Sequence, residues 1–146
     1  PDGVRVSLVR YATDAKVISF FDQDMSKSEK ITSVKTMAYS VGSTYTHLAL
    51  QLTRESVLVP ERGDRPDVPN LIIVTTDGVS RSQTKTQNEA AILKSNSDLK
   101  IFVIGIGKSV ADAELVNMAS RPEMVYKLTD FTQLTNIVGK IATFSC

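Results

Sequence analysis

The chain has 146 residues, enough for one domain with a substantial core. Its 17 basic and 16 acidic side chains leave a net charge of +1, so no charge excess favours nucleic acid or an anionic membrane as a partner. One histidine excludes a metal site built from several histidines, one cysteine excludes an internal disulfide, and no apolar run approaches the roughly 20 residues of a membrane span.

The first two predicted elements form a β-hairpin. The segment Val4–Tyr11 opens with alternating apolar and polar residues, and Ala15–Phe21 is a second strand. Because only a short turn at Thr13–Asp14 separates them, the two strands are predicted to pair antiparallel.

Two helices are predicted in the next part of the chain. The first runs through Met37, because its apolar residues recur three and four positions apart, at Ile31, Val34, Met37 and Ala38. The second ends at Pro60, and its apolar residues are Leu48, Ala49, Leu52 and Val59. A polar loop then runs from Glu61 to Pro69.

The second half of the chain alternates strands with helices. Leu71–Thr75 is a short apolar strand, and Ile101–Gly107 is almost continuously apolar, as in a parallel sheet covered on both faces. The other predicted elements are a helix containing Ala90 to Lys94, a helix over Asp112–Ala119, a strand over Met124–Leu128 and a closing helix over Phe131–Phe144. This alternation predicts an α/β, doubly wound, mostly parallel sheet with one antiparallel edge strand and helices on both faces.

Two polar loops are candidates for a ligand site at one edge of this sheet. Open α/β sheets bind ligands outside the carboxyl ends of their strands, and Asp77 directly follows such a strand end. Thr44 stands in a second polar loop, Gly42–Thr46, just before a predicted helix. Hydroxyl and carboxylate oxygens suit a hard cation such as Mg²⁺. Both residues also have structural alternatives, because Thr44 can cap the helix and Asp77 can form a turn with Gly78.

The order of these segments matches that of a known family. The matching segments are the strand Val4–Tyr11, the antiparallel strand Ala15–Phe20, a threonine loop within Met37–Leu50, a proline-led strand from Arg65 that ends in Thr-Asp-Gly at Gly78, and the later segments Phe102–Gly107 and Ala113–Phe131. Together they resemble a von Willebrand factor A (vWA) domain over the whole chain. The details resemble the matrilin and fibril-associated collagen branch more closely than integrin α-subunits.

The resemblance is incomplete at the metal site. The family begins with a central strand that ends in Asp-x-Ser-x-Ser, followed by a long helix, and neither is present in this sequence. That motif supplies most of the direct metal ligands, so only Thr44, which matches the metal-site threonine, and Asp77, which matches the second aspartate, carry over. Val41 and His47 stand where the family often has glycine, and we expect His47 on a helix surface. Residues 1–146 are therefore expected to form a single, N-terminally incomplete vWA domain, in which binding of Mg²⁺ or another divalent cation is weak or absent until the domain is intact.

One segment matches the absent motif by its letters alone. Asp24-Met25-Ser26-Lys27-Ser28 fits Asp-x-Ser-x-Ser and follows an apolar strand. Yet only sixteen positions (28 to 44) separate its last serine from Thr44, too few for the helix, hairpin and loops that should intervene. Asp24 or Ser26, with Ser28-Glu29, is better interpreted as the N-cap region of the helix through Met37. Metal ligation by this segment stays the alternative.

Arg62-Gly63-Asp64 is a literal cell-attachment tripeptide. It lies in a polar loop flanked by Pro60 and Pro66, where we expect it to be exposed. Matches this short arise often by chance, so the alternative is a plain connecting loop. We expect the tripeptide to be dispensable for adhesion.

The resemblance implies a non-catalytic, secreted adhesion or matrix-binding module. In the intact family site the cation keeps one coordination position open for an acidic residue of the partner, which would be collagen or another matrix component. The alternatives are a metal-independent assembly module, with self-assembly as one outcome, and a regulatory vWA domain of a larger enzyme. The resemblance also implies that Cys146 pairs with a cysteine before the first strand, in sequence upstream of Pro1. Because the sequence starts at Pro1 rather than at a methionine, we expect the chain to be a processed form or a fragment.

Overall fold

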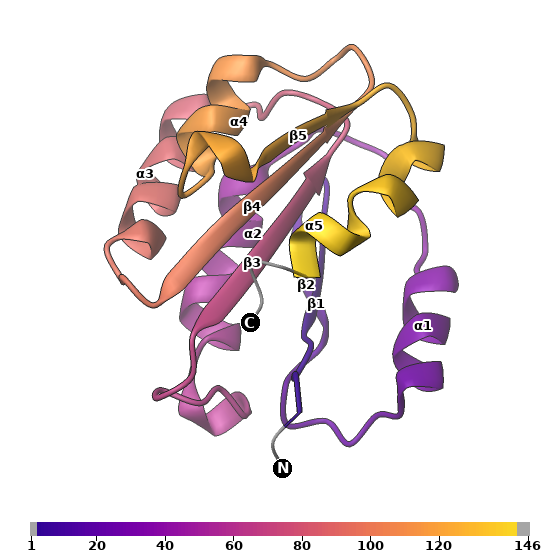
Figure 1. Cartoon of the computed structure of the whole chain (residues 1–146), viewed down its shortest axis with the longest axis vertical. Helices are drawn as coiled ribbons and strands as arrows, with labels where there is room; N and C mark the ends of the chain where they lie inside the picture. The colour runs from indigo at the N-terminus through magenta and orange to yellow at the C-terminus, as the bar shows by residue number, and fades with distance from the viewer. Residues whose placement is uncertain (1–2, 143–146) are drawn as a thin grey trace.

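The strands of the protein form two groups (Figure 1), in a computed structural model that describes residues 3–142. A hairpin pairs β1 (Leu8–Tyr11) with β2 (Ala15–Ser19) antiparallel. The main sheet contains β3 (Asn70–Thr76), β4 (Leu99–Ile106) and β5 (Val125–Leu128), in that order and all parallel. The α/β class expected from the sequence is therefore confirmed, with three parallel strands accompanied by an antiparallel pair.

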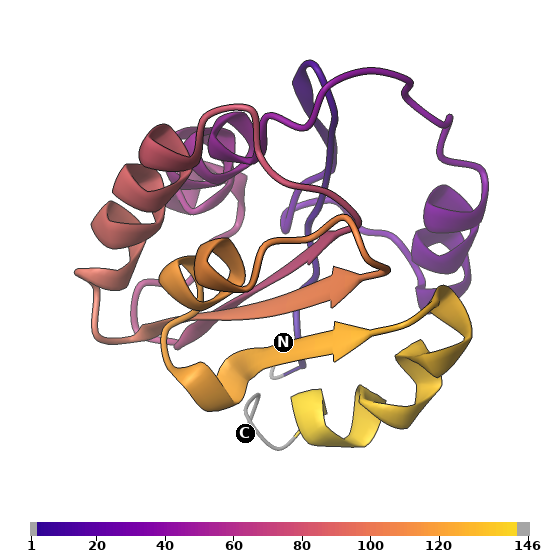
Figure 2. The same cartoon turned by 90° about the horizontal axis from the view of Figure 1, so that it is seen from above.

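Helices cover both faces of the main sheet. The α-helices are α1 (Lys27–Lys35), α2 (Thr46–Leu52), α3 (Gln83–Lys94), α4 (Asp112–Met118) and α5 (Val138–Ala142). Helix α2 continues as a π-helical turn over Thr53–Val57, and 3-10 turns lie at Pro60–Arg62, Pro122–Met124 and Phe131–Asn136. Figure 2 shows α2, α3 and α4 on one face of the strands and α5 on the other. Among the helices of the described residues, none has the length and apolar character to cross a membrane.

The core is centred on β4. Ile101, Phe102 and Val103 are fully buried, because helices lie on both faces of this strand. The parallel register places Ile72 of β3 beside Ile101 and Val74 beside Val103. Burial on both faces is the physical reason why this segment is almost continuously apolar.

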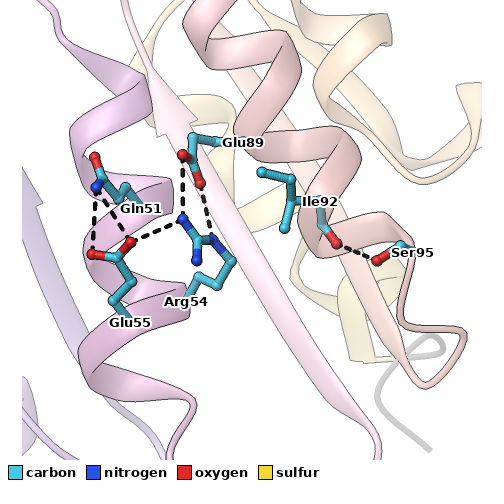
Figure 3. A network of polar contacts seen from close by, with 6 residues as sticks. All are labelled: Gln51, Arg54, Glu55, Glu89, Ile92 and Ser95. Carbon is cyan, nitrogen blue, oxygen red and sulfur yellow. Dashed lines mark hydrogen bonds and ion pairs between the residues drawn. The ribbon is translucent and has the colours of Figure 1, made fainter.

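A polar network joins α2 and its π-helical continuation to α3 (Figure 3). The Nε and Nη2 atoms of Arg54 donate to the two carboxylate oxygens of Glu89 at 3.0 and 3.3 Å, and Nη2 also donates to Glu55 at 3.0 Å. The hydrogen bond to Glu89 raises the pKa of Arg54. This bidentate geometry fixes the π-helical continuation of α2 against α3, and α2 itself begins at Thr46, the last residue of the Thr44 loop.

Three predicted elements differ from the structure. The first strand begins at Leu8 rather than Val4, and the predicted closing helix is a 3-10 turn followed by the short α5. Helix α1 buries none of its residues, and Ile31 and Val34 on its predicted apolar face are 44% and 52% exposed. No described element packs closely enough on α1 to cover that face. The spacing of apolar residues in the sequence does not show whether another element will cover them.

Candidate functional site

Thr44 and Asp77 lie together at the carboxyl edge of the strands. Strand β3 ends at Thr76, and Asp77 follows with its side chain exposed. A Cβ placed on Gly78 would lie 3.5 Å from the Thr44 hydroxyl oxygen, so that hydroxyl faces the Asp77–Gly78 segment. The structure thus brings the two predicted ligands to one place, while their role in metal binding stays a prediction.

Backbone hydrogen bonds fix the Thr44 loop from two sides. The amide of Tyr45 donates to the carbonyl of Ala12, just after β1, at 2.9 Å. The amide of Arg81 donates to the carbonyl of Thr44 at 2.8 Å. The loop is therefore held between the end of the hairpin and the segment that follows β3. Both contacts join backbone groups, so they place the loop as a whole.

The turn after β3 is also organised by hydroxyl groups. The hydroxyl of Thr76 donates to the carbonyl of Gly78 at 3.0 Å, and the same hydroxyl oxygen accepts the amide of Gly78 at 3.4 Å. Thr76 is buried, as is Thr46 at the start of α2. The exposed Asp77 carboxylate therefore projects from a turn whose own polar groups are already engaged.

A buried acid, Glu114, stands behind this turn and was not identified from the sequence. It lies in α4 and accepts the backbone N–H of Ser80 with both carboxylate oxygens, at 3.2 and 3.0 Å. Burial raises the pKa of its carboxyl group. The sequence signal for its position was its spacing. Glu114 lies four positions before the buried Met118 and therefore shares the same helix face.

A slot separates the hairpin from the main sheet. At one end the Tyr11 hydroxyl donates to the carbonyl of Thr75 at 3.0 Å, and at the other Arg5 donates to the carbonyl of Gly63 at 2.7 Å. Strands β1 and β3 therefore run in the same direction without pairing. The space between them is a cavity of about 440 Å³, lined by residues 4–9 on one side and 68–73 on the other, with Val57 and Leu58.

This slot agrees with the absence of a central strand from the sequence. An incomplete sheet predicts that β1 and β3 are not directly paired, and they belong to separate sheets. The side chain of Ile73 in β3 is 47% exposed, although it lies in the centre of a parallel strand. Both the facing strand edges and this apolar side chain are thus left uncovered by the described residues.

The segment Asp24–Ser28 caps a helix, as interpreted from the sequence. Ser26 is the N-cap of α1, its hydroxyl accepts the Glu29 amide at 3.3 Å, and the Glu29 carboxylate accepts the Ser26 amide at 2.8 Å. These reciprocal bonds are a capping box. Within residues 3–142 there is also no cluster of three or more His, Cys, Asp or Glu side chains that could hold a metal ion.

His47 does not lie on a helix surface, and that expectation is wrong. Its side chain is 8% exposed and packs edge-on against the Tyr45 ring, with 5.7 Å between ring centroids. Burial lowers the pKa of the imidazole. The residue directly follows the Gly42–Thr46 loop and faces the interior because α2 packs against α3. A buried lone histidine here is a packing residue.

The Arg62–Asp64 tripeptide is held by internal contacts. The Arg62 guanidinium lies 4.5 Å from the centre of the Phe20 ring, and the Asp64 carboxylate accepts from Asn70 at 3.0 Å. Gly63 has a φ of 84°, and a Cβ there would lie 2.6 Å from the backbone nitrogen of Asp22. Arg62 is exposed as expected, but Gly63 and Asp64 are half-buried, so the expectation of an exposed tripeptide is wrong for these two. Glycine is required here by the fold.

Cys146 lies outside the described residues, so its expected disulfide is not tested by the structure.

Comparisons with known proteins agree with the fold. The family model "von Willebrand factor type A domain" matches residues 1–140. The chain is 34% identical over 148 aligned positions to the collagen alpha-1(XX) chain of Mus musculus and 32% identical over 144 to matrilin-1 of Gallus gallus. The alignment with the collagen chain includes 100% of this chain but only 11% of that protein. The alignment with matrilin-1 includes 97% of this chain and 28% of that protein.

Solved structures show the same architecture. Proximal thread matrix protein 1 from the mussel byssus superimposes with a TM-score of 0.90 at 23% identity, over 99% of this chain and 37% of that one. A second structure of that protein, with a zinc-occupied MIDAS motif, gives a TM-score of 0.88 at 25% identity, over 100% and 36% of the two chains.

Proposed function

Because this chain belongs to the von Willebrand factor type A domain family, we propose that it is a non-catalytic recognition module whose partner binding depends on a divalent cation. The observation that carries the proposal is the approach of the Thr44 hydroxyl to the Asp77–Gly78 turn at the carboxyl edge of the strands. Its relatives include a collagen chain and matrilin-1, and its setting, like theirs, is the extracellular matrix.

The donor atoms at this edge fit a hard cation. Thr44 supplies a hydroxyl oxygen and Asp77 a carboxylate oxygen, which are ligands that Mg²⁺ prefers. Thr44 and Asp77 would hold the cation, which would offer an open coordination position to an acidic group of the partner. The zinc-occupied MIDAS motif of the mussel byssus protein supports a divalent cation in general rather than Mg²⁺ in particular.

Two protein ligands cannot complete the octahedral coordination of the cation. The slot between β1 and β3 indicates where the remaining ligands would come from. The facing strands β1 and β3 belong to separate sheets, and the cavity between them is lined by apolar residues such as Val6 and Leu71. We infer that the intact domain carries one further strand here, parallel to β3, and that its carboxyl end brings the remaining ligands toward Asp77. Residues 1–146 then hold an N-terminally incomplete form of the domain.

The proposed partner is collagen or another component of the matrix. The test is binding of the domain, extended upstream by the missing strand and helix, to immobilised matrix components in millimolar Mg²⁺, with and without a chelator. Loss of binding with the chelator, and with Asp77→Ala, is the expected result. Asp67→Ala, in the exposed loop before β3, is the matched control because it removes the same charge elsewhere.

A metal-independent assembly module is the second candidate. The exposed Ile31, Val34 and Ile73 side chains favour it, because they give the molecule uncovered apolar surface on which another chain could pack. Binding that survives both the chelator and Asp77→Ala would support this candidate. The relatives reported above are matrix proteins, which argues against the third alternative, the regulatory domain of an enzyme.

A further inference from the structure

Glu114 is a buried carboxylate with no ion pair among the described residues. Glu114 is only 6% exposed, and its carboxylate accepts the backbone amide of Ser80. A buried charge without a counterion is costly, and a neutral side chain of similar shape would pack there at lower cost. Such a group calls for a role beyond the packing of α4.

Helix α4 does not need this carboxylate for its own attachment. Leu115 and Met118 are almost completely buried, and a Cβ on Gly105 of β4 would lie only 2.5 Å from Leu115. At its other end the Lys94 ammonium of α3 donates to the carbonyls of Asn117 and Ala119, at 2.5 and 3.2 Å. The helix is therefore anchored independently at both ends of its apolar face.

The carboxylate instead holds the segment that carries Asp77. Ser80 is buried, three positions after Asp77, and its hydroxyl accepts from Thr86 at 2.9 Å. The next residue, Arg81, donates its amide to the carbonyl of Thr44. A continuous series of contacts thus runs from Glu114 through Ser80 and Arg81 to the Thr44 loop.

We propose that Glu114 is a positioning residue for the cation site, because its hydrogen bond to Ser80 sets the backbone that holds Thr44 beside Asp77. The inference rests on the proposed function and adds a residue to the same site. Outer-shell partners of metal ligands commonly change metal affinity by about 10–100-fold when they are lost.

Two variants separate positioning from simple electrostatics. Glu114→Asp keeps the negative charge but is one methylene shorter, so it loses its reach to the Ser80 amide. Glu114→Gln loses the charge but keeps an acceptor at the same reach. Positioning therefore predicts that Asp is the more damaging change, whereas a purely electrostatic effect predicts that Gln is. Thr86→Val is the matched control, because it removes a buried hydrogen bond from Ser80 without touching the Glu114 contact.

The measurement is NMR on the ¹⁵N-labelled chain without metal, followed by a Mg²⁺ titration of the form extended upstream by the missing strand and helix, observed at the Gly78 amide. Without metal, exchange of the Ser80 amide should accelerate in Glu114→Asp more than in Glu114→Gln, and remain near the parent rate in Thr86→Val. With Mg²⁺, affinity should fall about tenfold in Glu114→Asp, less in Glu114→Gln, and within about twofold in Thr86→Val. Signals of the buried β4 residues report whether each variant is folded.

The outcomes are distinct. If the parent form extended upstream shows no Mg²⁺ response at Gly78 even at high concentration, the cation site itself is wrong and the positioning role is overturned with it. If the parent responds and Glu114→Asp binds Mg²⁺ as tightly as the parent, the proposed function stands and the positioning role is overturned. If Gln is more damaging than Asp, the role is electrostatic and the inference is equally overturned.

Discussion

The hydroxyl of Tyr11, at the end of β1, donates a 3.0 Å hydrogen bond to the carbonyl of Thr75 near the end of β3. This bond bridges the slot between the hairpin and the main sheet, so it satisfies a strand-edge carbonyl that a neighbouring strand would otherwise engage. Burial raises the pKa of the phenol to about 12. One side chain thus links the two sheets beside the candidate metal site.

Tyr11→Phe should lower the free energy of unfolding by about 1 kcal/mol, the net value of a typical hydrogen bond. The ring is kept, so the loss reports the hydroxyl and its bond to Thr75. Urea unfolding should show a lower midpoint with an unchanged m-value. Tyr39→Phe is the control, because Tyr39 is 88% exposed and its hydroxyl has no comparable environment. Equal effects of the two substitutions would contradict the bridging role.

The raised pKa of Tyr11 makes stability sensitive to alkaline pH. The ordinary value is 10.0 and the folded value is about 12, so between them the native state keeps a proton that the unfolded chain has lost. Stability associated with the neutral phenol is therefore complete below about pH 10 and is lost progressively as the pH rises toward 12. The difference in unfolding free energy between the parent and Tyr11→Phe should shrink over this range. A difference that stays constant with pH would show that the folded phenol is not shifted.

Local patterns predicted what depends on neighbours in the sequence. The apolar run of β4, the capping box at Ser26 and Glu29, and the strand-end position of Asp77 all follow from spacing along the chain. Burial of polar side chains does not. Glu114 and His47 are buried because of what packs against α4 and α2. The spacing of Glu114 from Met118 shows only that the two share a helix face, not that the face is covered.

The break between β1 and β3 was predictable only through the family resemblance. No periodicity in either strand shows which edge is paired, because each strand has the same pattern with one neighbour or two. The exposure of Ile31 and Val34 could not be predicted for the same reason, because a sequence pattern does not show which element packs on it. An amphipathic pattern predicts that a face is suited to burial, whereas its partner must be supplied by another element.

Asp64→Glu should leave cell attachment unchanged. The substitution keeps the charge and breaks the Arg-Gly-Asp tripeptide, whose arginine stacks on Phe20 and whose aspartate bonds Asn70 rather than projecting freely. Attachment of cells to surfaces coated with the parent and the variant measures the effect, with Asp67→Glu in the same loop as control. A large loss in Asp64→Glu alone, with folding intact, would assign a recognition role to the tripeptide.

Cys146 should be disulfide-linked to a cysteine upstream of Pro1 in the secreted protein, as the vWA resemblance implies. Peptide mapping by mass spectrometry under non-reducing conditions should find the C-terminal peptide joined to an upstream one and released by reduction. The corresponding serine variant should lose that linkage. A free thiol in the secreted protein would contradict the prediction and weaken the expectation of an oxidising environment at this end of the domain.

Binding of Mg²⁺ should be weak in this chain and strong once the slot is filled. Thr44 and Asp77 offer two protein oxygens at one edge of the sheet, so water must complete the octahedral shell that Mg²⁺ demands. Calorimetry should therefore detect little heat with residues 1–146, and clear binding with a form extended upstream by the strand and helix that residues 3–142 do not contain. Asp77→Ala should abolish binding in the extended form, whereas Asp24→Ala should not, because the segment that contains Asp24 caps α1. Tight binding by the short form, lost in Asp24→Ala, would identify Asp24 and its neighbouring serines as a second ligand set. Absence of binding in the extended form would favour the metal-independent assembly module, since an intact edge that cannot hold a cation leaves apolar packing as the means of recognition.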